Sequence, residues 1–346
     1  MTTKRNFLRL AAGSALGLTL GAGAALAQDV TLRMHQFLPA QAAVPSTILE
    51  PWARKVEEAS GGKIKIEHYP SMQLGGKPPE LADQVKDGVV DIVWTLPGYT
   101  PGRFPQSEVF ELPFMMSGGG EATSRAFWQY AEANMMDKDF KDYHVIAVHV
   151  HGPGMIHSQE PIRSIKDLNG VKLRAPTRVT NKMFSALGAT PVGMPVPAVS
   201  EALSKGVIDA TVIPWEVTLP LKVSELVHNH TEFGDASLYT AAFMFAMNKD
   251  SYANLPDDLK AVIDANSGEE TSAWFGRLME EADVAGRDAA IAEGNTIIVL
   301  EPGEVQEWRD AASSVEAEWI GEMDGLGFDG QALVAQVRAL IEKNSK

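Results

Sequence analysis

Runs of alternating or continuous hydrophobic residues predict the strands in the first half of this chain. KIKIEHY at residues 63–69 alternates with the period of two that is typical of a half-buried strand, and VTLRMHQF at 30–37 is predicted to be the strand before it. VVDIVW at 89–94 is apolar on both faces, as is typical of a strand inside a parallel sheet. Helices are predicted between these strands, at 46–59 and 80–86, and this β-α-β-α-β order favours a parallel sheet with crossover helices.

Cap and turn residues set the boundaries of these elements. We expect Ser46 to cap the first helix and Gly61-Gly62 to end it. A helix near 121–134 and a strand at 144–150 complete the first set, which ends at the turn Gly152-Pro153-Gly154.

The same patterns return after this turn and predict a second set of elements. Strands are predicted at 171–175, 207–213, 241–247 and 296–300, and helices near 179–187, 198–205, 302–323 and 330–343, with a helix-rich stretch at 256–293 that breaks at Ser267-Gly268. The apolar strand at 241–247 could return to the first sheet. We therefore expect two α/β lobes joined by more than one crossing of the chain, lobe I comprising 28–151 with about 239–278, and lobe II with the bridging and C-terminal helices comprising about 152–238 with 279–346.

The first 27 residues are predicted to be a cleavable export signal. Lys4, Arg5 and Arg9 precede an apolar run at 10–26, and Ala25-Leu26-Ala27 is a small-x-small cleavage site. The apolar run is too weak for a membrane anchor, so we expect a periplasmic mature chain that is not inserted in the membrane. Both the Tat and the Sec export routes remain open.

Charge and cysteine content narrow the classes of partner. Without residues 1–27 the chain has 27 basic and 45 acidic residues, a net charge of −18 against −15 for the whole sequence. Such a chain repels nucleic acid and anionic membrane surfaces, and it would bind an anion only through local, desolvated contacts. It contains no cysteine, which excludes disulfides and thiol chemistry.

The familiar enzyme motifs are missing from the sequence. There is no phosphate-binding G-x-x-x-x-G-K-[ST], no G-x-G-x-x-G after a strand, no H-E-x-x-H and no G-x-S-x-G. His149, His151 and His157 lie close together, but no carboxylate nearby completes a metal site. We predict no metal, no cofactor and no enzyme activity, although a Ser/His/Asp triad of distant residues stays open from sequence alone.

The stretch GVKLRAP at 170–176 contains the most informative cation. Its alternation favours a half-buried strand with Lys172 and Arg174 facing water. The alternative is that Arg174 holds a ligand carboxylate, because a guanidinium presents parallel N–H donors that match two carboxylate oxygens.

A series of motifs gives the chain a family resemblance. They are MQLGG at 72–76, GVVD at 88–91, IKDLNGVKLRAP at 165–176, GATPV at 188–192 and GVID at 206–209. Together they resemble the substrate-binding protein of a tripartite ATP-independent periplasmic (TRAP) transporter, of the C4-dicarboxylate-type (DctP) family, over essentially the whole mature chain. The resemblance implies a two-lobed, type II-like periplasmic binding protein with mixed sheets, crossing strands and long bridging helices. It also implies closure on a small organic acid, delivery to a sodium-driven membrane permease, and Arg174 as the residue that binds the carboxylate.

Departures from the family pattern bear on the ligand. Where many members have a polar Gln-Glu-Asn before a proline, this chain has an apolar Ile213, and Trp215 follows as a possible flat wall. Gly154 stands where sialic-acid-binding relatives have a second arginine. These differences favour a carboxylate with an apolar or aromatic body, or a 2-oxo or 2-hydroxy acid, over a sugar acid; a dicarboxylate remains an alternative.

Loops after the first-lobe strands supply further candidates, because open α/β sheets bind ligands at the carboxyl ends of their strands. The predicted cleft residues are His35, Gln36, Phe37, Gln73, Trp94, Tyr99, His151 and His157, with Arg103 more typical of a solvated loop and Glu216 of a residue paired with a cation or with backbone groups. We expect a monomer. From the residues alone, a binding protein for an ATP-driven transporter, a secreted hydrolase and a partner of a membrane sensor kinase also stay open.

Overall fold

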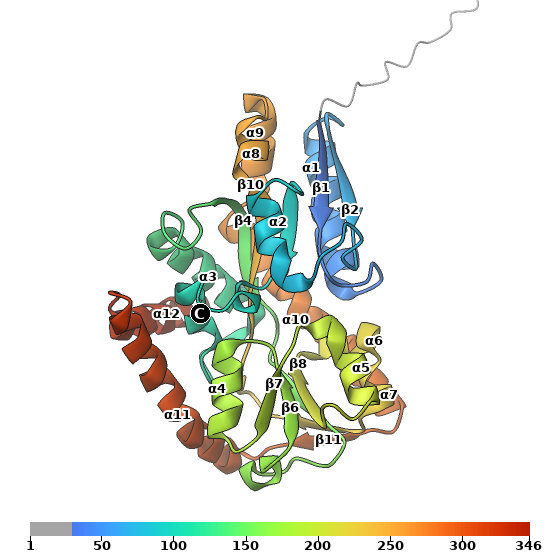
Figure 1. The fold of residues 1–346 in the computed structure, drawn as a ribbon, viewed down its shortest axis with the longest axis vertical. Helices are drawn as coiled ribbons and strands as arrows, with labels where there is room; N and C mark the ends of the chain where they lie inside the picture. Colours follow the sequence, from blue (N-terminus) through green and yellow to red (C-terminus); the bar gives the residue numbers. More distant parts are fainter. Residues whose placement is uncertain (1–29) are drawn as a thin grey trace, which may run out of the picture.

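The computed structural model describes residues 30–346 and contains two β-sheets that belong to two lobes (Figure 1). The predicted export signal lies outside the described residues. The sheet of lobe I has the strand order β2-β1-β3-β10-β4. Its strands are β1 (Val30–His35), β2 (Ile64–Tyr69), β3 (Ile92–Thr95), β4 (Tyr143–Val150) and β10 (Ala242–Asn248).

The first three strands of lobe I are parallel, as the β-α-β-α-β pattern predicts. Helix α1 (Glu50–Ala59) joins β1 to β2, and α2 (Leu81–Lys86) joins β2 to β3. Gly61 and Gly62 end α1 with positive φ angles of 64° and 79°, a conformation that glycine adopts without strain. The cap prediction at Ser46 is wrong. A π-helical turn (Val44–Leu49) precedes α1, and the Ser46 hydroxyl lies inside it and donates to the Ala42 carbonyl at 2.8 Å.

Strand β10 returns to the first sheet from the far side of lobe II, which confirms the expectation for residues 241–247. It lies antiparallel between β3 and β4, with Phe245 opposite both Trp94 and Ala147. All seven of its residues are buried, and Phe245 meets the Trp52 ring of α1 edge-on at 4.7 Å. A strand covered on both faces by helices has this continuous apolar pattern.

The sheet of lobe II has the order β11-β9-β5-β8-β6-β7. Its strands are β5 (Met155–Ser158), β6 (Lys172–Ala175), β7 (Thr190–Gly193), β8 (Ala210–Ile213), β9 (Asn229–Glu232) and β11 (Thr296–Val299). The sequence analysis missed β5, β7 and β9. Each has only four residues, and β9 reads Asn-His-Thr-Glu, so neither length nor apolar pattern marks it as a strand.

Helices cover both sheets and connect the lobes. Besides α1, α2 and the bridging helices, these are α3 (Gly119–Asn134), α4 (Arg178–Ala186), α5 (Val199–Ser204), α6 (Thr218–Leu221), α7 (Val223–Leu226), α8 (Lys249–Ala253) and α9 (Asp257–Ala265). The bridging helices are α10 (Glu269–Ala292), α11 (Pro302–Gly325) and α12 (Gly330–Asn344). Within residues 30–346, none of these helices is long and apolar enough to cross a membrane.

The long helices hold the two lobes in register. Helix α10 packs against α3 and β4 of lobe I and against the 3-10 turn Trp215–Val217 of lobe II. Helix α11 runs along α4 at one edge of the molecule and leads to α12, which packs on α3 (Figure 1). The chain therefore crosses between the lobes several times, as predicted.

Helices α3 and α10 meet at two glycines. A Cβ atom on Gly276 would overlap the Ser124 hydroxyl and the Gly120 carbonyl, and one on Gly120 would lie 2.5 Å from the Gly276 carbonyl oxygen. The contact is backbone against backbone, so it leaves no flexible side chain to move aside.

We expect Gly276→Ala to destabilise the protein by about 1–3 kcal/mol, because the added methyl group must push α10 away from α3. The matched control is Gly321→Ala in α11, where no atom lies within 4 Å of the added Cβ. Removing a helical glycine there should stabilise by about 0.5–1 kcal/mol. Urea unfolding of both variants measures this, and equal effects would show that the glycine contact carries no constraint.

Candidate functional site

The carboxyl ends of strands from both sheets border one cavity between the lobes. Lobe I contributes the ends of β1, β3 and β4, and lobe II contributes β6 and the end of β8. The cavity contains about 360 Å³ of atom-free space, counted to its openings, and the centre of a water-sized sphere can occupy about 30 Å³ of it. It is lined by Phe37, Leu38, Trp94, Leu96, Tyr99, His151, Arg174, Pro176, Val196, Ile213, Pro214, Glu216, Val217, Tyr239, Ala241 and Phe243.

Stacked aromatic rings form the lobe I wall of this cavity. Trp94 stacks with Phe37 and with Phe243, at ring-centroid distances of 4.9 Å and 4.7 Å, and its plane is only 11° from that of Phe243. The Trp94 indole N–H donates to the buried His149 Nε2 at 2.9 Å, which fixes the ring. A fixed flat wall of this kind suits a planar apolar ligand.

Arg174 is the charged group on the opposite wall, and it is only 1% exposed. Its Nε donates to the Met194 carbonyl at 2.9 Å and its Nη1 to the Val212 carbonyl at 3.3 Å. Its Nη2 is buried without a hydrogen-bond partner, and within residues 30–346 no carboxylate pairs with this guanidinium. The expectation from alternation, that Arg174 faces water, is wrong, because lobe I residues such as Tyr99 line the same cavity and cover this end of β6, whereas Lys172 on the same strand is 45% exposed.

His151 closes the cavity beside Arg174. Burial, with a smaller contribution from the Arg174 charge, lowers the pKa of His151 to about 4, so the ring is neutral at pH 7. The Ala241 N–H donates to His151 Nε2 at 3.0 Å, which assigns the proton to Nδ1, facing the Gly152 carbonyl. His151 therefore contributes a neutral ring to the wall, and both of its nitrogens already bond the backbone.

Glu216 is an acid on the cavity wall, 4% exposed. Its backbone N–H donates to Asp283 Oδ1 at 2.7 Å, while its own Oε2 is buried without a partner. Burial, and then the nearby Asp283, raise the pKa of Glu216 to about 8. The sequence expectation that Glu216 pairs with a cation or with backbone groups is not met by its side chain.

Tyr239 fills the space beside Gly154. A Cβ atom on Gly154 would overlap the Tyr239 ring, and the Tyr239 hydroxyl donates to the Val212 carbonyl at 3.3 Å. The place that a second arginine would need is therefore occupied. Sequence reasoning missed Tyr239 and Phe243, although both flank the start of the predicted strand 241–247, which enters the sheet next to β3.

The structure brings together six of the predicted cleft residues, namely Phe37, Trp94, Tyr99, His151, Arg174 and Ile213. Trp215 does not line the cavity. It packs against His157 and His230 and donates to Glu232 Oε1 at 3.0 Å, because the turn after Pro214 directs Trp215 away and Glu216 inward.

The remaining candidates also lie outside the cavity. His35 is buried against Gln84 and the Leu74 N–H, and Gln73 is exposed on the turn that His35 supports. Gln36 bonds the backbone of Leu38. Arg103 pairs with Asp83 at 2.5 Å near the surface of lobe I, in agreement with its expected role as a loop cation. Within residues 30–346 no cluster of three or more His, Asp or Glu side chains suits a metal ion.

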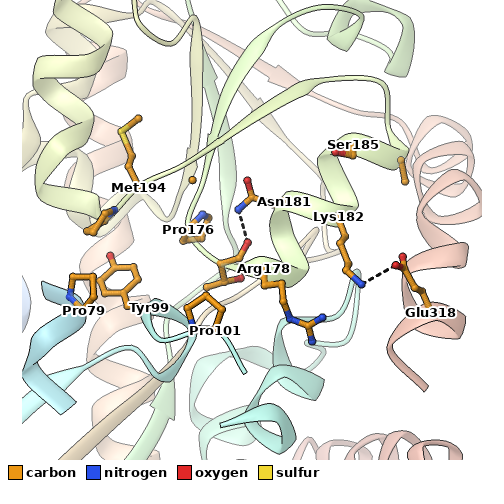
Figure 2. Close-up of a pocket in the computed structure, with 15 residues that line it drawn as sticks. Pro79, Tyr99, Pro101, Pro176, Arg178, Asn181, Lys182, Ser185, Met194 and Glu318 are labelled. Carbon is orange, nitrogen blue, oxygen red and sulfur yellow. Dashed lines mark hydrogen bonds and ion pairs between the residues drawn. The ribbon is translucent and has the colours of Figure 1, made fainter. Parts of the chain in front are cut away.

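An open groove continues from the cavity toward the surface (Figure 2). It shares Tyr99 and Pro176 with the cavity, and Asn181 and Lys182 of α4 line its lobe II side. Lys182 reaches across to Glu318 of α11 at 2.7 Å, as Figure 2 shows. The groove is therefore the outer part of the cleft between the lobes.

Direct contacts close the cleft below this groove. The Val196 N–H of lobe II donates to the Tyr99 hydroxyl of lobe I at 2.9 Å. Arg178 of α4 forms an ion pair with the buried Glu108 of lobe I. A Cβ atom on Gly98 of lobe I would lie 2.5 Å from Thr177 Cγ2 of lobe II and 3.1 Å from the Glu111 carboxylate. The structure shows the lobes closed on the cavity.

Comparison with known proteins identifies relatives along almost the whole chain. The family model of bacterial extracellular solute-binding protein, family 7 (DctP), matches residues 36–322. The chain is similar to a TRAP solute-binding protein from Rhodoferax ferrireducens in complex with copurified benzoate, with 52% identity, a TM-score of 0.90, and coverage of 91% of this chain and 98% of that one.

Two further relatives widen the range of ligands. A marine metagenome TRAP solute-binding protein described as specific for aromatic acid ligands, in complex with 3-hydroxybenzoate, is 49% identical with a TM-score of 0.90, over 92% of this chain and 100% of that one. The ectoine/5-hydroxyectoine-binding periplasmic protein UehA of Ruegeria pomeroyi is 26% identical over 335 residues, 94% of each chain.

Glu111, beside the cleft, gives a test of the site's electrostatics. Burial raises its pKa to about 8, so the native protein holds a proton there that the unfolded chain releases above its ordinary pKa of 4.5. Tighter proton binding in the native state adds its full contribution to the free energy of unfolding below pH 4.5. That contribution is lost as the pH rises to about 8.

We therefore compare the free energy of unfolding of Glu111→Gln with that of the unmodified protein. We expect the difference to shift in favour of the variant as the pH rises from about 5 to about 8, and to be constant above pH 8. The gain should reach a few kcal/mol, since a change of one in a pKa corresponds to about 1.4 kcal/mol. Urea unfolding across this pH range measures it, with the exposed Glu281→Gln on α10 as the surface control. A difference that does not vary with pH would contradict a protonated Glu111.

Proposed function

The chain belongs to the bacterial extracellular solute-binding protein family 7, the solute-binding proteins of TRAP transporters, and we propose that its ligand is an aromatic monocarboxylate of the benzoate class. The observation that carries this proposal is the buried guanidinium of Arg174, which lines a cavity with an aromatic wall and whose Nη2 is buried without a hydrogen-bond partner. We propose that the ligand carboxylate accepts from this guanidinium while its ring lies against Trp94.

Electrostatics favours an anion in this position. A buried charge without a partner is unfavourable by several kcal/mol, and a charge-assisted hydrogen bond in a water-poor cavity offsets that penalty. The two carbonyls of Met194 and Val212 orient the guanidinium but carry no net charge. A single carboxylate would complete the site.

The rest of the lining favours an apolar body over a hydroxylated one. Ile213, Val196, Leu96 and the stacked rings present no hydrogen-bond partners, so the several hydroxyl groups of a sugar acid would be left unsatisfied there. The absence of space for a side chain at Gly154 removes a second cationic anchor. The two relatives with half of their residues identical to this chain carry benzoate and 3-hydroxybenzoate, which have one carboxylate and a flat ring.

The transport role extends this binding step. We propose that the chain is exported to the periplasm by its N-terminal signal, acts there as a non-catalytic monomer, and presents its closed form to the TRAP permease. If the ligand favours the closed form, the permease can distinguish the ligand-bound protein from the free protein by its shape.

Replacement of Arg174 tests the carboxylate anchor. We expect Arg174→Ala to weaken benzoate binding by about 2–5 kcal/mol, at least about 30-fold in Kd, because the ligand carboxylate loses its buried partner. Arg174→Lys keeps the charge but not the planar fork, and should bind with intermediate affinity. The control is Lys172→Ala on the same strand, whose side chain is 45% exposed. Isothermal titration with benzoate measures all three, and unchanged affinity in Arg174→Ala would refute the anchor.

A screen of the unmodified protein tests the ligand class itself. Thermal melting with aromatic, 2-oxo, dicarboxylic and sugar acids should give its largest shift with the aromatic monocarboxylates. A large shift with sugar acids alone would refute the proposed ligand class.

Gly98→Ala tests whether closure is needed for binding. The added methyl group would collide with Thr177 across the cleft and disfavour the closed lobes, so we expect benzoate to bind about tenfold more weakly. The control is Gly193→Ala on the same groove, where the new Cβ would lie 3.6 Å from Asn181 Nδ2, an ordinary contact. Equal affinities for the two variants would show that binding does not require this contact.

A further inference from the structure

We propose that the carboxyl group of Glu216 recognises a hydroxyl substituent on the ring of the ligand, so that the site prefers hydroxylated aromatic acids. This inference rests on the proposed aromatic monocarboxylate and specifies which members of that class the site selects. It is carried by the position of Glu216 on the cavity wall and by its buried, unpartnered Oε2.

The backbone around Glu216 holds its side chain in the cavity. The 3-10 turn Trp215–Val217 is fixed from behind by α10, where a Cβ atom on Gly286 would overlap the Trp215 carbonyl. The Glu216 N–H bonds Asp283 of the same helix, and the neighbouring Trp215 is anchored to Glu232. Glu216 is thus a preorganised group, and its free oxygen is left for a ligand.

Arg174 and Glu216 bind different groups of the proposed ligand: Arg174 binds the carboxylate and Glu216 binds the ring hydroxyl. No ion pair joins them within the described part of the chain, so the acid does not neutralise the guanidinium. Both groups line the cavity together with Tyr239, which lies within electrostatic range of each. A ligand whose carboxylate meets Arg174 can therefore bring another polar atom to Glu216.

The charge state of Glu216 suits this task. With a pKa of about 8 it is mostly protonated at pH 7, so it can donate an O–H and accept through its carbonyl oxygen without repelling an anionic ligand. A phenolic hydroxyl can both donate and accept, and would satisfy the group that an unsubstituted ring leaves without a partner. A buried site that hydrogen-bonds a ligand hydroxyl discriminates strongly against the analogue that lacks it.

The test compares benzoate with 2-, 3- and 4-hydroxybenzoate, which differ from it by one hydroxyl group. Titration calorimetry of the unmodified protein at about pH 6.5 should give at least one hydroxybenzoate a Kd about tenfold or more below that of benzoate. Glu216→Leu should reduce this preference to less than about threefold while still binding benzoate, which shows that the cavity has folded. Glu216→Gln keeps a donor and an acceptor and should retain the preference.

Two results would overturn the inference and leave the proposed function intact. One is an unmodified protein that binds benzoate more tightly than all three hydroxybenzoates; the other is a Glu216→Leu variant that keeps the full preference. An unmodified protein that binds none of the four acids would instead refute the proposed ligand class, and this inference with it.

The pH dependence of binding provides a second, independent measurement. Asp283 from α10 is the ionisable group that contacts Glu216, and those that share the cavity with it are Arg174 from β6, Tyr99 after β3, His151 after β4 and Tyr239 before β10. Above about pH 8 the ionised Glu216 would repel the ligand anion, so affinity should fall between about pH 6.5 and 8.5. Glu216→Gln should reduce this fall, and Asp283→Asn, the control for the second buried acid, should not abolish it. An unchanged pH profile in Glu216→Gln would overturn the inference.

Discussion

A guanidinium buried without a counter-ion is the constraint around which this molecule is organised. Arg174 is held out of water by a sheet on one side and by the opposite lobe on the other, and its Nε and Nη1 donate to the backbone carbonyls of Met194 and Val212. Dipoles of this kind orient a charge but compensate it incompletely. The closed lobes therefore enclose an incompletely compensated positive charge, which an anionic ligand of the proposed class would neutralise.

Four other ionisable groups near the cavity are kept neutral, so they do not offset the positive charge of Arg174. Burial lowers the pKa of His149 to about 3 and that of His151 to about 4, and it raises the pKa values of Glu111 and Glu216 to about 8. At pH 7 these groups act as hydrogen-bonding surfaces and carry little charge. A chain with a net charge of −15 can thus accommodate an anion, because its many acids lie elsewhere or hold a proton.

The cavity exists only where the two lobes meet. Its aromatic wall is assembled from β1, β3 and β10, and the last of these is contributed by a segment that follows most of lobe II in the chain. Two close contacts, the Gly276 backbone against that of Gly120 and Gly98 against the Thr177 side chain, set how far the helices and lobes approach. Small changes in these contacts would therefore alter the ligand site at a distance, since a packed interface transmits displacement.

The sequence by itself determined the order of the main elements, the return of residues 241–247 to the first sheet and, through the family resemblance, the role proposed for Arg174. Hydrophobic period and turn residues are local properties, so they suffice for long elements such as α10 and β10. Only the tertiary structure decided that Arg174 is buried, that Glu216 faces the cavity while Trp215 turns away, and that Tyr239 occupies the space at Gly154. It also decided the short strands β5, β7 and β9, which read MIHS, TPVG and NHTE and lie outside the apolar or alternating runs that mark the equally short β3 and β8. The reason is physical: which side of a turn a residue faces, and which ring it meets, depends on neighbours that are far away in the chain and are brought together by sheet order and lobe closure.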